Sequence, residues 1–229
     1  MTPERLEKIK SVLVKRQPDL RIITDHVHKG RNLSAIVRTA DAVGVTDVHS
    51  VMDDDDYIAF RGTAKGSHQW VKMNIEQDIT SIIDRLKVEG FQFVAADVTA
   101  HSIDFRQVDY TRPTALVMGA EKWGLSKEAR AKIDQFITVP MVGMVESFNV
   151  SVASAIILSE AQRQREDAGF YQEQRICAER YDRLFFEWCQ PKIAEYCRRY
   201  QLDYPSLDDY GEIENASAWY QSVRSVEVR

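Results

Sequence analysis

The strongest constraint on the fold is the alternation of short apolar segments with longer segments of helical periodicity. Hydrophobic runs typical of strands occur at residues 21–27, 47–52, 91–96 and 114–118. Helices are expected up to about residue 16 and at residues 28–45 and 75–87. Strands that alternate with helices in this way predict an α/β fold with a mostly parallel, helix-covered sheet.

Residues 137–155 combine three features in one short stretch. An apolar run from Ile137 predicts a strand, and Pro140 and Gly143 indicate the loop that follows it. Asn149 then stands at the start of a helix, where a short polar side chain accepts bonds from free backbone N–H groups. A junction of this kind suits a ligand site, although an ordinary strand, loop and helix with a capping asparagine has the same pattern.

Two earlier segments of the chain also combine polar residues with glycines. Residues 28–45 have an apolar helical stripe closed by Gly44, and the opposite face carries Arg31, Ser34, Arg38 and Asp41. Residues 114–129 predict a buried strand, a tight turn and a helix. In that turn, Gly119 and Gly124 permit a positive φ or the close approach of a ligand to the backbone.

Taken in chain order, HKGRNLSAIVRTADAVGV, LVMGAEKWG and VPMVGMVESFNVSVASA resemble the three motifs of the SpoU branch of the SPOUT family of RNA methyltransferases. The resemblance extends through KRQPDL, DYTRPT and EAQRQRE and covers most of residues 15–170. Three ordered motifs are far more specific than a lone glycine pattern. The resemblance implies a SPOUT-type α/β sheet with a C-terminal trefoil knot, S-adenosyl-L-methionine bent into the knot loops, and a homodimer that completes the active site.

The resemblance also implies a reaction, the 2'-O-methylation of a guanosine ribose in the D-loop of tRNA, at guanosine-18. Arg38 is the expected central catalytic residue. Because an arginine side chain stays charged, we expect it to stabilise the developing alkoxide and clamp an RNA phosphate rather than act as a base. The other expected catalytic residues, each with a competing role in capping, pairing or loop bonding, are Asn32, Glu121, Ser147 and Asn149. The expected cofactor-binding residues are Ala96, Gly119, Val139, Met144 and Phe148, and no metal is expected.

The charge distribution separates a basic start from acidic segments. The chain has a formal charge of -5, yet residues 1–31 hold eight basic and four acidic side chains, a local +4. Acidic residues concentrate in the run Asp53 to Asp56 and near the C-terminus, so RNA is not expected to cross those surfaces. The residues expected to contact RNA are Arg16, Arg31, Arg163 and Arg165, and the alternative is a solvated helical face. No DNA partner is expected.

Composition indicates a cytoplasmic protein built around one core. At 229 residues the chain has no apolar run of membrane-spanning length, and its first twenty residues are charged rather than signal-like. The three cysteines lack metal-ligand spacing and are expected to be reduced structural thiols. We expect a basic N-terminal helical segment at residues 1–20, a methyltransferase domain at 21–165 and a C-terminal helical extension at 166–229. The aromatic residues of the extension suit core packing better than base stacking.

Two positions depart from the family pattern: Glu146 replaces a glutamine, and Trp123 replaces a smaller turn residue. Two alternative functions remain. A catalytically inactive SPOUT-like RNA-binding protein is disfavoured by the complete set of polar motif residues. A ribosomal RNA 2'-O-methyltransferase is disfavoured because only about twenty residues precede the first strand, which leaves no room for a separate N-terminal RNA-binding domain.

Overall fold

The computed structural model describes residues 1–52 and 69–224, with side chains to Val223. The acidic run Asp53 to Asp56 therefore lies outside the described residues. The chain forms two compact units. The larger unit is Arg16–Gln172, and the smaller one joins Met1–Lys15 to Glu173–Arg229. The two terminal segments thus belong to one unit, although they are far apart in the sequence.

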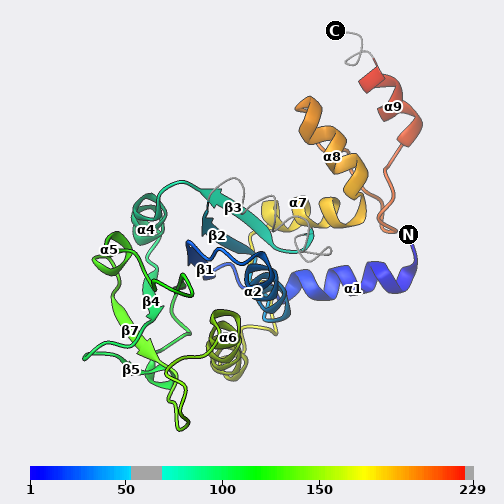
Figure 1. Ribbon diagram of the computed structural model, residues 1–229. Coiled ribbons are helices and arrows are strands. Elements are labelled where there is room, and N and C mark those ends of the chain that lie inside the picture. The colour runs from blue at the N-terminus through cyan, green and yellow to red at the C-terminus, as the bar shows by residue number, and fades with distance from the viewer. Residues whose placement is uncertain (53–68, 225–229) are drawn as a thin grey trace. The chain divides into compact units, whose positions relative to one another are not determined.

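The larger unit contains a seven-stranded sheet with the order β3-β2-β1-β6-β4-β7-β5, in which every adjacent pair is parallel (Figure 1). Its strands are β1 (Leu20–Asp25), β2 (Asp47–Val51), β3 (Lys72–Glu76), β4 (Gln92–Ala96), β5 (Ile103–Asp104), β6 (Thr114–Gly119) and β7 (Gln135–Thr138). The predicted α/β class and mostly parallel sheet are confirmed.

Helices cover both faces of this sheet (Figure 1). One face carries α2 (Gly30–Ala42), α6 (Val150–Asp167) and the short helix η2 (Phe105–Gln107), and the other carries α4 (Ile79–Val88) and α5 (Lys127–Arg130). Successive side chains of β6 alternate between the two cores, with Leu116 and Met118 in the first and Ala115 and Val117 in the second. Burial on both faces explains why this strand is a continuous apolar run.

The prediction of a helix at residues 75–87 is corrected at its start. Residues up to Glu76 form the edge strand β3, and α4 begins only at Ile79. The cause is Asp78, whose carboxylate accepts bonds from the backbone N–H groups of Thr80 at 3.1 Å and Ser81 at 2.8 Å. An aspartate that caps in this way sets the first turn of the helix. Gly44 has φ 84° after α2, as its predicted role in closing that helix requires.

Arg165, at the end of α6, is a buried connecting residue of the larger unit. Its guanidinium donates to the side chains of Gln17 at 3.0 Å and Asp19 at 2.7 Å, and to the carbonyl oxygen of Tyr110 at 2.9 Å. It also donates to the backbone carbonyls of Asp19 and Arg112. These five bonds use the full donor capacity of the side chain.

Two of the expected RNA contacts are therefore corrected. Arg165 is fully buried, and Arg16 is 1% exposed and donates to Asp41 Oδ1 at 2.6 Å. Neither guanidinium reaches the surface. Arg163 is exposed but pairs with Glu160 and Asp167 on its own helix, at 2.7 Å in each case. Arg31 is exposed at the start of α2.

The smaller unit is helical. Its first helix, α1 (Pro3–Val14), packs against α7 (Ala178–Cys189), which is followed by α8 (Pro191–Tyr200) and α9 (Ala216–Arg224). Phe186 and Trp188 are buried, and the Phe186 ring stacks on Tyr204 with centroids 4.4 Å apart. These two aromatic residues therefore belong to the core. No helix among the described residues has both the length and the apolar character that crossing a bilayer requires.

Candidate active site

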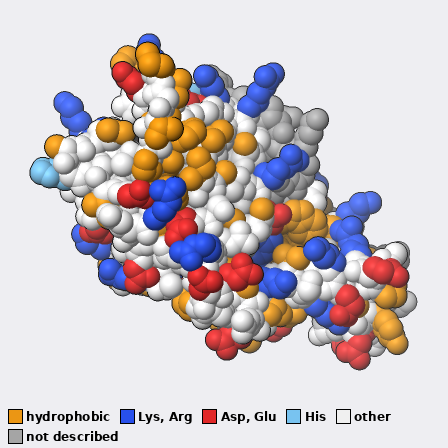
Figure 2. Space-filling model, turned by 90° about the horizontal axis from the view of Figure 1, so that it is seen from below, with side chains coloured by type: hydrophobic (Ala, Val, Ile, Leu, Met, Phe, Trp, Pro, Cys, Tyr) orange, Lys and Arg blue, Asp and Glu red, His pale blue; other side chains and the backbone are white. Residues whose placement is uncertain are grey.

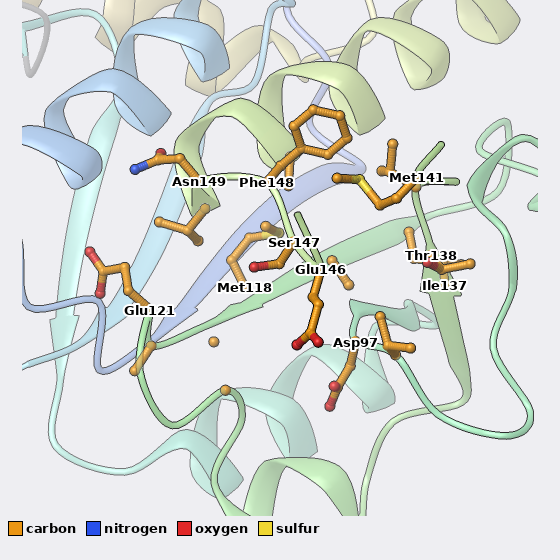
Figure 3. Close-up of a pocket in the computed structure, with 18 of the residues that line it drawn as sticks. Asp97, Met118, Glu121, Ile137, Thr138, Met141, Glu146, Ser147, Phe148 and Asn149 are labelled. Carbon is orange, nitrogen blue, oxygen red and sulfur yellow. The ribbon is translucent and has the colours of Figure 1, made fainter. Parts of the chain in front are cut away.

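A cavity of about 440 Å³ opens where β4, β6 and β7 end. Ligand sites in parallel sheets lie outside the carboxyl ends of the strands, because the loops that leave several strands meet there. The cavity is lined by residues at the ends of the three strands, Ala96–Val98 for β4, Met118–Glu121 for β6 and Ile137–Val139 for β7 (Figure 3). Glu146–Val150, from the loop before α6 and the first residue of that helix, complete this part of the wall. The second and third motif segments thus meet at one cavity.

Hydrogen bonds connect all three motif segments beside this cavity. Asn32 Nδ2 donates to Glu121 Oε1 at 2.5 Å, and Asn149 Nδ2 donates to Asn32 Oδ1 at 3.2 Å. Figure 3 shows the side chains of Glu121 and Asn149 on the same side of the cavity. The side-chain amide of Asn32 therefore donates to Glu121 through its nitrogen and accepts from Asn149 through its oxygen.

The competing structural roles are resolved differently for the two asparagines. Asn32 lies inside α2, whose N-cap is Lys29, so it does not cap that helix. Asn149 does cap α6, because its Oδ1 accepts from Ser151 N at 2.9 Å. Asn149 therefore has both a capping bond and a bond to Asn32. Ser147 lines the cavity.

The turn after β6 requires its glycines for its own geometry. A Cβ on Gly119 would lie 2.4 Å from Gly124 C and 2.6 Å from Leu125 N. Gly124 has φ 68°, and it exchanges two backbone hydrogen bonds of 2.9 Å with Ala120. The space beside Gly119 is thus taken by the turn backbone rather than by a ligand, which corrects the reason expected for this glycine.

Of the expected cofactor residues, Ala96, Gly119, Val139 and Phe148 line the cavity. Met144 does not, because its side chain is 99% exposed at the outer part of the loop. Sequence reasoning missed Asp97 and Thr138, both of which line the cavity. Their positions at or just beyond the ends of β4 and β7 were the available signal.

Charged groups make the cavity wall acidic. The charged lining residues are Lys29, Asp97, Glu121 and Glu146, and Asp97 Oδ2 lies 2.5 Å from Arg130 Nη2. A wall with more carboxylates than cations suits a ligand that carries positive charge. In the part of the chain that the structure describes, no three His, Cys, Asp or Glu side chains converge as a metal site.

Arg38 is separate from this cavity. It is exposed on α2 and is not among the lining residues. Trp123, at the tip of the turn after β6, is 73% exposed, and Lys122 Nζ lies 4.5 Å from the centre of its ring. The structure therefore brings Asn32, Glu121, Ser147 and Asn149 together, but it leaves Arg38 outside the lining of the cavity.

The sequence matches two family models that cover most of its length. One is described as the SpoU rRNA Methylase family and matches residues 19–159, and the other as SpoU, rRNA methylase, C-terminal and matches residues 163–216. The chain belongs to the SpoU rRNA methylase family.

The chain is also similar to individual proteins whose names give a substrate or a reaction. The chain is similar to the tRNA (guanosine(18)-2'-O)-methyltransferase of Escherichia coli, with 44% identity over 98% of this chain and 99% of that protein. With the enzyme of the same name from Thermus thermophilus it shares 48% identity over 82% of this chain and 96% of the relative. The crystal structure of the A. aeolicus TrmH/SpoU tRNA modifying enzyme matches with a TM-score of 0.76 at 41% identity, over 81% of this chain and 94% of that one. The SpoU methyltransferase AviRb from Streptomyces viridochromogenes, crystallised with AdoMet, matches with a TM-score of 0.58 at 26% identity, over 67% and 61% of the two chains.

Proposed function

We propose that this chain transfers the methyl group of S-adenosyl-L-methionine to the ribose 2'-hydroxyl of guanosine-18 in tRNA. The observation that carries the proposal is the hydrogen-bonded set of Glu121, Asn32 and Asn149 beside a cavity at the ends of parallel strands. The relatives that share 44% and 48% identity are named for this reaction, which supports the choice of nucleotide.

The lining of the cavity fits the cofactor. Met118, Val139 and Phe148 offer apolar surface for adenine, and the strand ends offer backbone N–H and C=O groups to bond its edge. The carboxylates of Asp97 and Glu146 suit the positive charges of the methionine part. When bound, S-adenosyl-L-methionine supplies a methyl group on a cationic sulfur.

The protein must align a weak oxygen nucleophile and stabilise it as its proton leaves. We assign to Arg38 the stabilisation of the developing alkoxide and the binding of a neighbouring phosphate, because a planar guanidinium can contact both. Asn32, Glu121 and Asn149 would hold the polar wall in one arrangement. Ser147, in the loop between β7 and α6, would contact the ribose or the loop backbone.

We also propose that the active form is a homodimer. The loop before α6 and the first turn of α6 expose Val142, Met144, Val145, Phe148 and Val152. Figure 2 shows hydrophobic side chains gathered on the face seen from below, the side on which this loop lies in Figure 1. Exposed apolar patches of this kind favour burial against a partner, and a second copy would bring its own α2 residues near the cavity.

The oligomeric state is tested by ultracentrifugation of Val152→Glu. Val152 is 44% exposed and does not line the cavity. A buried unpaired charge should dissociate the dimer, whereas Val88→Glu, at a position 90% exposed on α4, should leave it intact. Monomeric wild-type protein would contradict the proposal.

We infer that the chain is threaded as a trefoil knot near β7 and α6. Strand β7 pairs with β4 on the side away from β6, and the chain then returns past β4 and β6 to pack α6 against α2. We assign residues 21–165 to methyl transfer, residues 1–20 to a basic N-terminal segment whose helix ends at Val14, and residues 166–229 to the helical extension. We propose a cytoplasmic location, because the relatives that share 44% and 48% identity are bacterial enzymes named for tRNA methylation.

The reaction is tested with tRNA that carries 2'-deoxyguanosine at position 18. A nucleophile that is absent cannot react, so labelled methyl incorporation should disappear while binding stays nearly unchanged. Methyl groups that map to a base atom would contradict the 2'-O assignment. Methyl groups that map to another ribose, or to ribosomal RNA alone, would contradict the target.

A further inference from the structure

A second hollow in the larger unit has a cationic rim. It has a volume of about 490 Å³ and is lined by Thr99, His101, Lys127, Arg130, Ala131 and Phe136. None of these is a carboxylate, and His101, Lys127 and Arg130 are all exposed. Among the described residues, Lys127 makes no ion pair. The lining of the hollow is therefore cationic, and the carboxylate that pairs with Arg130, that of Asp97, lies outside the lining.

Arg130 stands between this hollow and the cavity of the candidate active site. Its Nη2 atom lies 2.5 Å from Oδ2 of Asp97, which lines the cavity. The same atom lies 3.7 Å from the place that a Cβ on Gly124 would occupy, and Gly124 also lines the cavity. The next residue along the chain from Val98 of the cavity is Thr99 of the hollow. The two hollows therefore share a wall.

Local hydrogen bonds fix the two segments that form the hollow. The backbone N–H of Thr99 donates to Ser102 Oγ at 2.8 Å, and that hydroxyl donates to the carbonyl of Asp97 at 2.6 Å. On the other side, Ser126 caps α5 by accepting from Ala129 N at 3.2 Å. A ligand at this place would meet groups that are already positioned, which lowers the entropic cost of binding.

Three of the four arginines that were expected to contact RNA are buried or paired. Arg16 and Arg165 are buried, and Arg163 is paired with two carboxylates. A chain with a formal charge of -5 must nevertheless contact several phosphates to hold a tRNA. Lys127 and Arg130 are exposed cations next to the reaction site. Arg130 pairs with one carboxylate, that of Asp97, so Lys127 supplies the charge that is not neutralised by an ion pair among the described residues.

We propose that this hollow binds one nucleotide of the RNA substrate near the acceptor ribose, a proposal that rests on the proposed function. Its phosphate contacts Lys127 and Arg130, where a guanidinium and an ammonium bind anionic oxygens. Its sugar or base lies on Ala131 and the half-buried ring of Phe136, because an aromatic face accepts any base by stacking. The subsite positions the RNA without reading its sequence.

The test compares Lys127→Glu with Lys87→Glu. Lys87 is exposed on α4 and lines neither hollow, so the two variants have the same net charge but differ at the subsite. Binding of tRNA is measured by fluorescence anisotropy over a range of salt concentrations, S-adenosyl-L-methionine affinity by calorimetry, and kcat and KM by methyl transfer.

For Lys127→Glu we expect KM for tRNA to rise about tenfold with little change in kcat, because uniform binding is lost. The salt dependence of tRNA binding should flatten by about one unit of slope. Cofactor affinity should stay within about twofold of the wild type, since Lys127 does not line the cavity. Lys127→Gln should shift the same quantities less, in the same direction.

Equal tRNA binding and kinetics in the Lys127 and Lys87 variants, with an active wild type, would overturn the subsite alone. A wild-type protein that binds the cofactor but methylates no RNA would overturn the proposed function instead. The two failures are therefore distinguishable.

Discussion

Asn32 and Glu121 are 89 residues apart in the sequence, yet the side-chain amide of Asn32 donates to the Glu121 carboxylate at 2.5 Å. The same amide accepts a bond from Asn149, so one side chain joins residues from the three motif segments. Glu121 and Asn149 both bond to Asn32, so a change at Asn32 should affect both contacts.

Asn32→Asp should destabilise the protein by about 1–3 kcal/mol, because it places a carboxylate against Glu121 where a donor stood. The double variant Asn32→Asp with Glu121→Gln restores a donor and an acceptor at that contact. Urea unfolding should show that the second change recovers most of the lost stability. Methyl transfer should remain low in both, and full recovery of activity would show that Glu121 has only a structural role.

Arg38→Ala should cut methyl transfer by roughly a hundredfold or more, as the loss of a charge partner in the transition state does. Folding and cofactor affinity should stay near those of the wild type, because Arg38 is exposed and does not line the cavity. Arg38→Lys should lose methyl transfer as well, because a lysine ammonium is a compact point charge and cannot make the paired hydrogen bonds of a planar guanidinium. Single-turnover rates with saturating tRNA test the catalytic role of Arg38, and near-normal turnover in the variant would contradict that role.

Gly119→Ala should lower stability by about 1–3 kcal/mol or more and weaken cofactor binding, because the added Cβ overlaps the backbone of the turn. Gly143→Ala is the matched control. A Cβ at Gly143 meets nothing within 4 Å, and this glycine is not among those with a positive φ. Thermal unfolding and calorimetry should separate the two variants, and equal behaviour would argue against the close packing of the turn.

Arg165→Met should destabilise the protein by about 3–5 kcal/mol, because it leaves a carboxylate and three backbone carbonyls without their donor. Arg163→Met, two positions earlier on the same helix, should change stability by less than about 1 kcal/mol. The Arg163 side chain is exposed, and Glu160 keeps a bond from Gln164 when Arg163 is removed. Denaturant midpoints of the two variants test this contrast. A small effect at Arg165 would mean that water replaces the lost donor.

The three thiols should differ in reactivity. Cys177 is exposed, whereas Cys189 and Cys197 are buried. Burial raises the pKa of the Cys189 thiol to about 11, so little thiolate is present at neutral pH. Mass spectrometry after brief iodoacetamide treatment at pH 8 should find Cys177 alkylated well before the other two. Rapid alkylation of Cys189 in the folded protein would contradict its burial.

Local patterns were sufficient to predict the parallel α/β architecture, the presence of β1 and α2, and the start of α6. These features depend on residues close in sequence, such as Gly44 after α2 and Asn149 before α6. Strand β3 was not predicted, because its burial is only partial and a short edge strand has weak periodicity. The cap at Asp78 decided that boundary.

The candidate site was predicted unevenly for a similar reason. Motif positions identified Asn32, Glu121 and Asn149, but the bonds between them depend on long-range packing. Charge counting assigned Arg16 and Arg165 to RNA, whereas both are buried. A sequence shows where a charge is, but its burial is decided by the carbonyls and carboxylates that the fold brings around it.

The bonds of Arg165 also bear on how this chain is made. Gln17 and Asp19 leave the ribosome among the first residues, but their buried partner is not synthesised until nearly 150 residues later. Until then Asp19 lacks its ion pair, and the carbonyls of Tyr110 and Arg112 lack their donor. Domains generally fold as units during synthesis, so completion of this one must wait until α6 has emerged. A nascent chain truncated before Arg165 should therefore be far more sensitive to protease than one that extends beyond residue 172.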